Sequence, residues 1–190
     1  MSNMTHLIFE GAELTGKSFI ASQIYNHLEA KYHQGPDRLD GCYWFNCDVG
    51  VFGSNQGQDI ISSYLKMLVA LKNNNVILEK FQISDQIYNE LYQNQKIKYR
   101  CVEKKLKKLG YKIIFLTFPE DEAIIKKRLT DRLNLYPHYA RIAKEPAFYI
   151  KQQKLYREYL QASQLEYLEI AITNFPDNTA IDKILKFIGE

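Results

Sequence analysis

The stretch Gly11-Ala12-Glu13-Leu14-Thr15-Gly16-Lys17-Ser18 decides the fold, because it matches the pattern G-x-x-x-x-G-K-[ST] of a P-loop. The stretch Leu7-Ile8-Phe9-Glu10 before it, apolar except for its last residue, predicts a short buried strand. Residues 17–32 after it predict a helix, since apolar residues recur there at every fourth position. Strand, glycine-containing turn and helix form the context in which such a loop binds phosphate. The sequence therefore predicts that residues 11–18 bind the phosphates of a nucleotide.

The residue types in the loop fit that chemistry. Backbone N–H groups and the positive end of the following helix surround a phosphate. Gly11 and Gly16 permit backbone angles and close approach that a Cβ would block. Lys17 is expected to reach the β- and γ-phosphates, and the Ser18 hydroxyl to ligate Mg²⁺.

Length and composition indicate an ordinary α/β protein. The chain has 190 residues, 46% hydrophobic, which suits one domain spanning 1–190. The net charge of +3 does not require a nucleic-acid partner. The three cysteines lack the spacing of a metal site and are predicted to be reduced thiols. No apolar run approaches the ~20 residues that a membrane span needs. The N-terminal residues lack the features of a signal peptide. We therefore expect a cytoplasmic protein without a membrane partner.

Strand and helix patterns alternate along the chain. Further apolar runs predict strands at 42–47, 76–78, 113–116 and 167–170. Helical patterns occupy 60–71, 84–91, 102–109, 120–132, 148–163 and 181–188. Ser84 and Asp85 are interpreted as an N-cap, and 49–57, with three glycines, as a flexible loop. Such alternation predicts a parallel sheet covered by helices on both faces.

In a sheet of this kind, ligands bind at the carboxyl ends of the strands, which would bring Asp48, Glu79 and Lys80 close to the P-loop. Asp48 follows the second strand and could accept a substrate proton or bind Mg²⁺ through water; it could equally be a turn residue before Gly50. Glu79 stands where P-loop enzymes place a second Mg²⁺ contact, although a solvated strand end is the alternative. Lys80 is a candidate for binding an acceptor phosphate.

A basic region surrounds a break in the helical pattern at 133–143, which contains Pro137. Its cations are Lys126, Lys127, Arg128, Arg132 and Arg141. Phosphoryl transfer needs positive charge against the transferring group, and a mobile arginine lid supplies it. Arg128 and Arg132 are four residues apart and project together towards the break. We therefore predict a lid at about 133–143 with Arg128, Arg132 and Arg141 as catalytic candidates.

Three segments, at 8–18, 76–88 and 119–156, resemble the P-loop phosphotransferases of the thymidylate kinase and deoxynucleoside kinase families. The resemblance implies a five-stranded parallel sheet with the third strand beside the first, and a helical lid. It also implies ATP with Mg²⁺ as the donor, a nucleoside or nucleoside monophosphate as the acceptor, and Phe81 beside Lys80 in the acceptor site. In one departure, Lys80 stands where the family usually has arginine, so bidentate phosphate binding is lost. In another, the chain between Asp48 and Glu79 is shorter than the family usually has, so the acceptor identity stays open.

Other functions remain alternatives to this kinase. They are a polynucleotide 5′-kinase, another small P-loop phosphotransferase, and a nucleotide-binding module with little catalysis. A regulatory GTPase is disfavoured because no D-x-x-G follows the third strand and no N-K-x-D follows a later one. The lysines of 104–108 flank an apolar stripe and are interpreted as a solvated helix face, which disfavours nucleic acid as a partner. A homodimer is left open.

Overall fold

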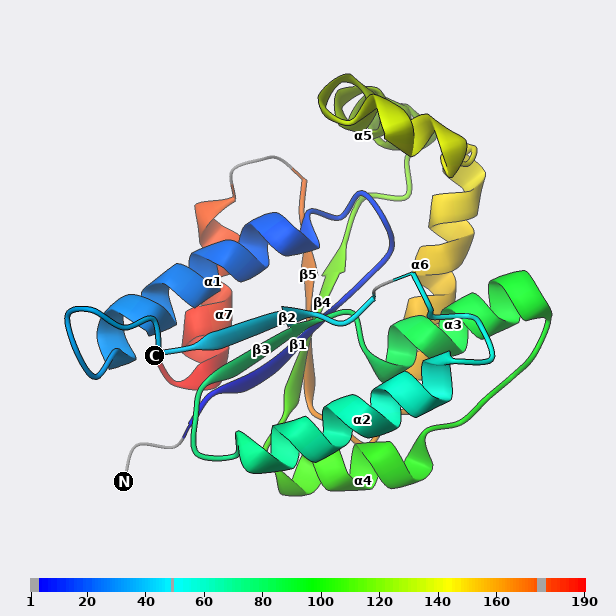
Figure 1. Cartoon of the computed structure of the whole chain (residues 1–190). Helices are drawn as coiled ribbons and strands as arrows, with labels where there is room; N and C mark the ends of the chain where they lie inside the picture. The colour runs from blue at the N-terminus through cyan, green and yellow to red at the C-terminus, as the bar shows by residue number, and fades with distance from the viewer. Residues whose placement is uncertain (1–3, 49, 174–176) are drawn as a thin grey trace.

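The structure is a computed structural model that describes residues 4–48, 50–173 and 177–190. Residues 1–3, residue 49 of the predicted glycine-containing loop, and residues 174–176 lie outside the described residues. The elements follow one another as β1 (His6–Glu10), α1 (Lys17–Tyr32), β2 (Tyr43–Asn46), α2 (Gly57–Ala70), β3 (Val76–Glu79), α3 (Gln82–Gln93), α4 (Arg100–Lys108), β4 (Lys112–Thr117), α5 (Glu122–Leu135), the 3₁₀ helix η1 (Pro137–Arg141), α6 (Pro146–Gln161), β5 (Tyr167–Ala171) and α7 (Asn178–Ile188) (Figure 1).

The five strands form one parallel sheet in the order β2-β3-β1-β4-β5. The third strand therefore lies beside the first, as predicted. Glu79 pairs in register with Phe9 of β1 on one side and with Asn46 of β2 on the other. Because parallel strands end at the same edge, this register places the residues that follow β1, β2 and β3 side by side.

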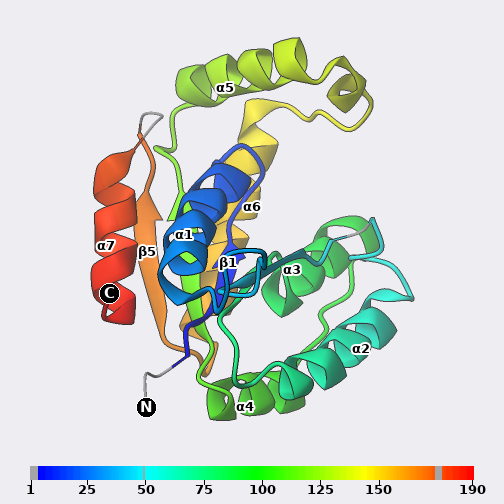
Figure 2. The same cartoon turned by 60° about the vertical axis from the view of Figure 1, so that its left-hand side comes forward.

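Helices cover both faces of the sheet. Side chains alternate along each strand, so Leu7 and Phe9 pack under α1 and α7, while Ile8 packs on the opposite face with residues of α2, α3, α4 and α6. Figure 2 shows α1 and α7 on one side of the sheet and α2, α3 and α4 on the other. The prediction of a three-layer α/β fold is confirmed.

The segment 133–143 is more helical than predicted. Helix α5 continues to Leu135 and η1 spans Pro137–Arg141, so only residues 136, 142 and 143 of the expected loop are outside a helix. Pro137 disfavours the α conformation at the residue before it, and Tyr136 accordingly leaves the helix with φ −137° and ψ 78°. Helix α5 and η1 stand beyond the edge of the sheet, at the top of Figure 1.

The predicted start of α3 was wrong. The helix begins at Gln82, and Phe81 occupies the N-cap position without a side-chain cap of its own. Ser84 and Asp85 lie inside the helix and are fully buried. Elsewhere, no helix among the described residues has the length and apolar character needed to cross a membrane.

Candidate active site

The P-loop makes a tight turn between β1 and α1. Gly11 has φ +143°, and a Cβ there would lie 2.3 Å from the carbonyl oxygen of Leu116, so only glycine fits. Gly16 has φ +83° and begins α1. The Lys17 ammonium lies within the loop and donates to the carbonyls of Gly11 at 2.8 Å and Ala12 at 2.7 Å. Burial lowers the pKa of Lys17.

Two candidate metal ligands meet at the start of α1. The Ser18 hydroxyl donates to Glu79 Oε1 at 2.5 Å, and Glu79 is the last residue of β3 and only 4% exposed. A hydroxyl and a carboxylate oxygen suit Mg²⁺, which prefers oxygen ligands. In proteins this ion usually takes several of its ligands from water molecules and from substrate phosphates. Among the described residues, no group of three or more His, Cys, Asp or Glu could hold a metal ion by itself. The oxygens of Ser18 and Glu79 therefore fit an ion that is shared with a bound phosphate.

Lys80 lies between two carboxylates at the end of β3. Its backbone is in the left-handed region with φ 58°, and its ammonium lies 2.8 Å from Glu13 Oε1 and 2.8 Å from Asp48 Oδ2. The Tyr88 hydroxyl donates to the same oxygen of Glu13 at 3.0 Å. Burial raises the pKa of Glu13, but the charges of Lys80 and Lys17 outweigh burial and lower this pKa to about 2. Burial lowers the pKa of Lys80, and the two carboxylates more than reverse that effect.

Asp48 forms the turn contact that the sequence suggested and also pairs with Lys80. Its Oδ1 accepts the N–H of Gly50 at 3.1 Å, which is the turn interpretation, while Oδ2 binds Lys80. The side chain is 13% exposed. Asp48 thus fixes the chain after β2 and also faces the residues after β3.

The loop predicted to be flexible is anchored where the structure describes it. The N–H of Gly53 donates to Asp85 Oδ1 at 2.8 Å, and the Tyr99 hydroxyl donates to Asp85 Oδ2 at 2.7 Å. A Cβ at Gly57 would lie 2.2 Å from Asp85 Oδ1, so this glycine packs directly on the carboxylate. The glycines of this loop therefore allow close packing against α3.

Arg128 and Arg132 reach the site from α5. The Arg128 guanidinium donates to the carbonyl of Leu14 in the P-loop and to the carbonyls of Ile172 and Thr173 after β5. The guanidinium carbon of Arg132 lies 4.6 Å from the ring centroid of Tyr136, within cation–π range. Arg128 therefore ties α5 to the P-loop and to the chain that follows β5.

A cavity of about 490 Å³ opens between the P-loop, the ends of β2 and β3, and α5. Its lining residues are Glu13, Leu14, Gly16, Lys17, Ser18, Phe19, Asn46, Glu79, Lys80, Arg128, Asp131, Arg132, Leu135 and Tyr136. Asp48 does not line this cavity and lies behind Lys80. Arg141 is exposed on η1, away from the lining. Phe81 is fully buried, edge-on to the ring of Tyr64, so its placement does not support substrate contact.

Sequence reasoning missed Glu10, the last residue of β1. Its fully buried carboxylate accepts the N–H of Phe81 at 3.0 Å, the N–H of Ser84 at 3.4 Å and the Ser84 hydroxyl at 2.5 Å, and so caps α3 from another element. Burial raises the pKa of Glu10 to about 7. A polar residue that ends an apolar strand was the signal that pointed to Glu79, and it applied to Glu10 as well. Gln152 of α6, whose Oε1 accepts the N–H of Glu13 at 3.0 Å, had no such signal.

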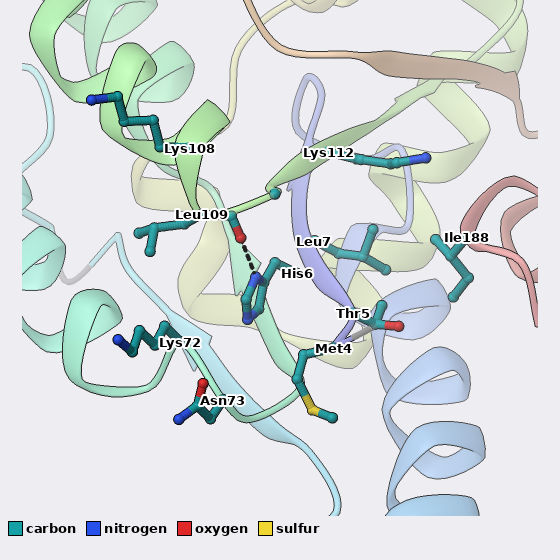
Figure 3. Close-up of a pocket in the computed structure, with 11 residues that line it drawn as sticks. Met4, Thr5, His6, Leu7, Lys72, Asn73, Lys108, Leu109, Lys112 and Ile188 are labelled. Atoms are coloured by element: carbon teal, nitrogen blue, oxygen red, sulfur yellow. Dashed lines mark hydrogen bonds between the residues drawn. The ribbon is translucent and has the colours of Figure 1, made fainter. Parts of the chain in front are cut away.

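A second cavity, of about 890 Å³, lies at the opposite edge of the sheet around His6 (Figure 3). The ring of His6 lies 2.6 Å from the carbonyl oxygen of Leu109, the contact dashed in the figure. The side chains of Lys72, Lys108 and Lys112 extend away from His6. Because its polar groups do not converge, this cavity is the weaker candidate for an active site.

Comparison with known proteins identifies the fold of the chain. No family model and no curated protein sequence matches the chain. Among solved structures, it is similar to the YorR protein from Bacillus subtilis in complex with phosphorylated GDP, with a TM-score of 0.68 and 19% identity over 97% of this chain and 96% of that one. It is also similar to shikimate kinase from Bacteroides thetaiotaomicron, with a TM-score of 0.55 and 12% identity over 98% and 99% of the chains. Deoxyadenosine kinase from M. mycoides with bound dATP gives a TM-score of 0.55 and 15% identity over 98% and 100%. The chain has the fold of the P-loop kinases, and at these identities the similarity establishes the fold alone.

Proposed function

We propose that the protein is a kinase that transfers the γ-phosphoryl group of ATP, with Mg²⁺, to a nucleoside or a nucleoside monophosphate. The contact between Ser18 and Glu79 carries this proposal, because it joins a P-loop to an acidic strand end inside one cavity. P-loop enzymes hold their metal with such a pair. The neighbouring structures of a deoxyadenosine kinase and of YorR with phosphorylated GDP support a nucleotide-related substrate.

On the donor side, residues 11–18 bind the phosphates of ATP through backbone N–H groups. Lys17 neutralises charge on the β- and γ-phosphates. Ser18 and Glu79 would hold Mg²⁺, which supplies charge neutralisation and orientation of the phosphates when it is bound. The segment 133–143, with the end of α5, closes over the nucleotide as a lid and brings Arg128, Arg132 and Arg141 towards the transferring group.

On the acceptor side, Asp48 takes the proton of the acceptor hydroxyl, while Lys80 lines the pocket. General-base assistance is worth ~10²–10⁴ in rate, and positioning supplies the rest for a loose transition state. The enzyme is proposed to act as one domain in the cytoplasm, where the unpaired state of Cys42, Cys47 and Cys101 is expected.

A different small acceptor is the main alternative, because shikimate kinase is among the similar structures. The test is a panel of nucleosides, nucleoside monophosphates, shikimate and a 5′-hydroxyl oligonucleotide, each incubated with ATP and Mg²⁺ and analysed for product. We expect a nucleoside or nucleoside monophosphate to be phosphorylated. Preference for another panel member would overturn the assignment, and a protein that binds ATP but phosphorylates nothing would be a binding module.

The variant Lys17→Ala controls for contaminating kinases. It should lose most turnover while its circular dichroism spectrum stays that of the wild type, since Lys17 neutralises the transferring phosphates. Turnover near that of the wild type would remove Lys17 from the mechanism.

A further inference from the structure

Every hydrogen-bond donor of the Lys80 ammonium faces a partner of the protein itself. An ammonium has three N–H donors. Carboxylates of Glu13 and Asp48 each lie 2.8 Å from Lys80 Nζ, and the ring centroid of Tyr88 lies 5.5 Å away, within cation–π range. The Lys80 side chain is 14% exposed. A lysine held in this way has no donor left to offer a phosphate unless a carboxylate is displaced.

The cluster formed by Glu13, Asp48 and Lys80 carries one net negative charge, since it combines two carboxylates with one ammonium. The Tyr88 hydroxyl stabilises the ionised form of Glu13 by donating to its Oε1. This cluster lies where β2 and β3 end, beside the P-loop, with Glu13 and Lys80 on the cavity wall. The negative charge therefore faces the part of the cavity that the acceptor would occupy.

The other cations of the cavity wall come from the P-loop and from α5, and the charge of Lys17 also acts on Glu13. Lys17 belongs to the P-loop, and Arg128 and Arg132 project from α5. A bound nucleoside triphosphate brings about four negative charges and would engage these three residues. Among the described lining residues, Lys80 is the cation at the end of β3, and the carboxylates of Glu13 and Asp48 neutralise its charge.

Building on the kinase function proposed above, we propose that the acceptor is an uncharged nucleoside and not a nucleoside monophosphate. A monophosphate would bring its negative charge next to Glu13, with Asp48 behind Lys80, and like charges in a partly desolvated site repel strongly. A sugar hydroxyl instead donates hydrogen bonds, and each carboxylate oxygen keeps a lone pair to accept one. In the reaction, the hydroxyl oxygen bonds to the γ-phosphorus as the bond from that phosphorus to the β–γ bridging oxygen breaks. ADP leaves with the electron pair, and the hydroxyl proton passes to the Asp48 carboxylate.

The test compares each nucleoside with its own 5′-monophosphate. Both ribo- and deoxyribo-forms of the common bases are assayed with ATP and Mg²⁺, and kcat/KM is measured for each pair. We expect the best nucleoside to exceed its monophosphate by at least about tenfold in kcat/KM. A monophosphate that exceeds its nucleoside would overturn this inference and leave the proposed kinase function standing. If no nucleoside or monophosphate is phosphorylated, both fall.

Two variants test whether the carboxylates cause the preference. Glu13→Gln and Asp48→Asn each remove one negative charge with little change of size. Each should raise the ratio of monophosphate to nucleoside kcat/KM by about tenfold, and the double variant should raise it further. Because it is a ratio, this measure does not depend on the folded fraction of a variant.

Asp131→Asn is the matched control, because it removes one carboxylate from the α5 wall of the same cavity. It should leave the ratio unchanged. If the ratio stays constant in Glu13→Gln and Asp48→Asn, or shifts as much in Asp131→Asn, the charge of the Lys80 cluster does not select the acceptor.

Discussion

The Ser18 hydroxyl and the Glu79 carboxylate are in direct contact at 2.5 Å, although 61 residues separate them in the chain. The contact exists because β1 and β3 are neighbours in the sheet and Glu79 pairs in register with Phe9. The helix that begins after the P-loop therefore starts against the end of β3. This arrangement brings together the two oxygens that the proposed function assigns to a metal ion shared with phosphate.

The first prediction follows from that contact and concerns Mg²⁺. Glu79→Gln keeps the size of the side chain but removes its charge, so the ion loses an anionic ligand. We expect the Mg²⁺ concentration for half-maximal activity to rise and kcat to fall, each by about 10–100-fold, a loss typical of groups that hold or orient a metal. The measurement is a Mg²⁺ titration of steady-state activity at saturating ATP. Superimposable titrations of wild type and variant would show that Glu79 does not hold the ion.

The second prediction concerns Glu10 and the pH dependence of stability. Burial raises its pKa in the folded protein from 4.5 to about 7. The folded state therefore binds the proton more tightly than the unfolded state, and this group lowers the free energy of unfolding as pH rises between these two values. Over this pH range, the ionisation of Glu10 lowers the free energy of unfolding by roughly 3 kcal/mol. Glu10→Gln cannot ionise, so wild type should lose stability relative to this variant between pH 5 and pH 8.

Urea unfolding at pH 5 and pH 8 measures this difference, and Glu13→Gln serves as its control. The pKa of Glu13 is lowered to about 2, so its stabilising contribution is present above its ordinary value of 4.5 and is lost only as pH falls towards 2. Between pH 5 and pH 8, the stability difference between wild type and Glu13→Gln should therefore stay constant. An identical pH dependence of wild type and Glu10→Gln would mean that Glu10 does not titrate in this range.

The third prediction concerns the lid. If residues 133–143 close over a bound nucleotide, ATP with Mg²⁺ should slow tryptic cleavage after Arg141 several-fold, because an ordered segment resists proteolysis. Cleavage after Arg38, in the exposed chain before β2, should not change. Mass spectrometry of a time course measures both sites in one sample. Equal cleavage after Arg141 with and without nucleotide would contradict the lid.

The sequence predicted those features of the fold and the site that follow from short patterns of neighbouring residues. The P-loop, the five strands and the acidic residue at the end of the third strand follow from local periodicity and spacing, and the parallel neighbours follow from the strand–helix alternation. The family resemblance supplied the position of β3 beside β1. The five parallel strands were confirmed, and β1, β3 and β4, which are buried along almost their whole length, leave the strong apolar signal of strands covered on both faces.

The sequence did not predict contacts that depend on tertiary geometry. Lys80 meets Glu13 across 67 residues, in a conformation with a left-handed backbone that no local pattern specifies for a lysine. Asp85 looked like a helix cap because Asp favours that position, yet Glu10 caps α3 and Asp85 anchors Gly53. A cap from a distant strand competes with local propensity and cannot be recognised from nearby residues.

The last prediction separates the two roles of Asp48. Asparagine forms the same side-chain turn to a following N–H, so Asp48→Asn should keep the bond to Gly50 and the fold of the chain after β2. It cannot accept a proton as a carboxylate does. We therefore expect kcat to fall by ~10²–10⁴, the usual worth of a general base, while the dissociation constant of ATP stays within about twofold.

Stopped-time assays with the best acceptor and fluorescence titration with ATP measure these two quantities independently. Glu13→Gln is the comparison, because it removes the other carboxylate from Lys80 without removing the proposed base. Its kcat for the same acceptor should fall by less than that of Asp48→Asn. An active enzyme that is indifferent to Asp48→Asn would remove Asp48 from proton transfer, and positioning between the P-loop and the end of β3 would then have to account for the rate.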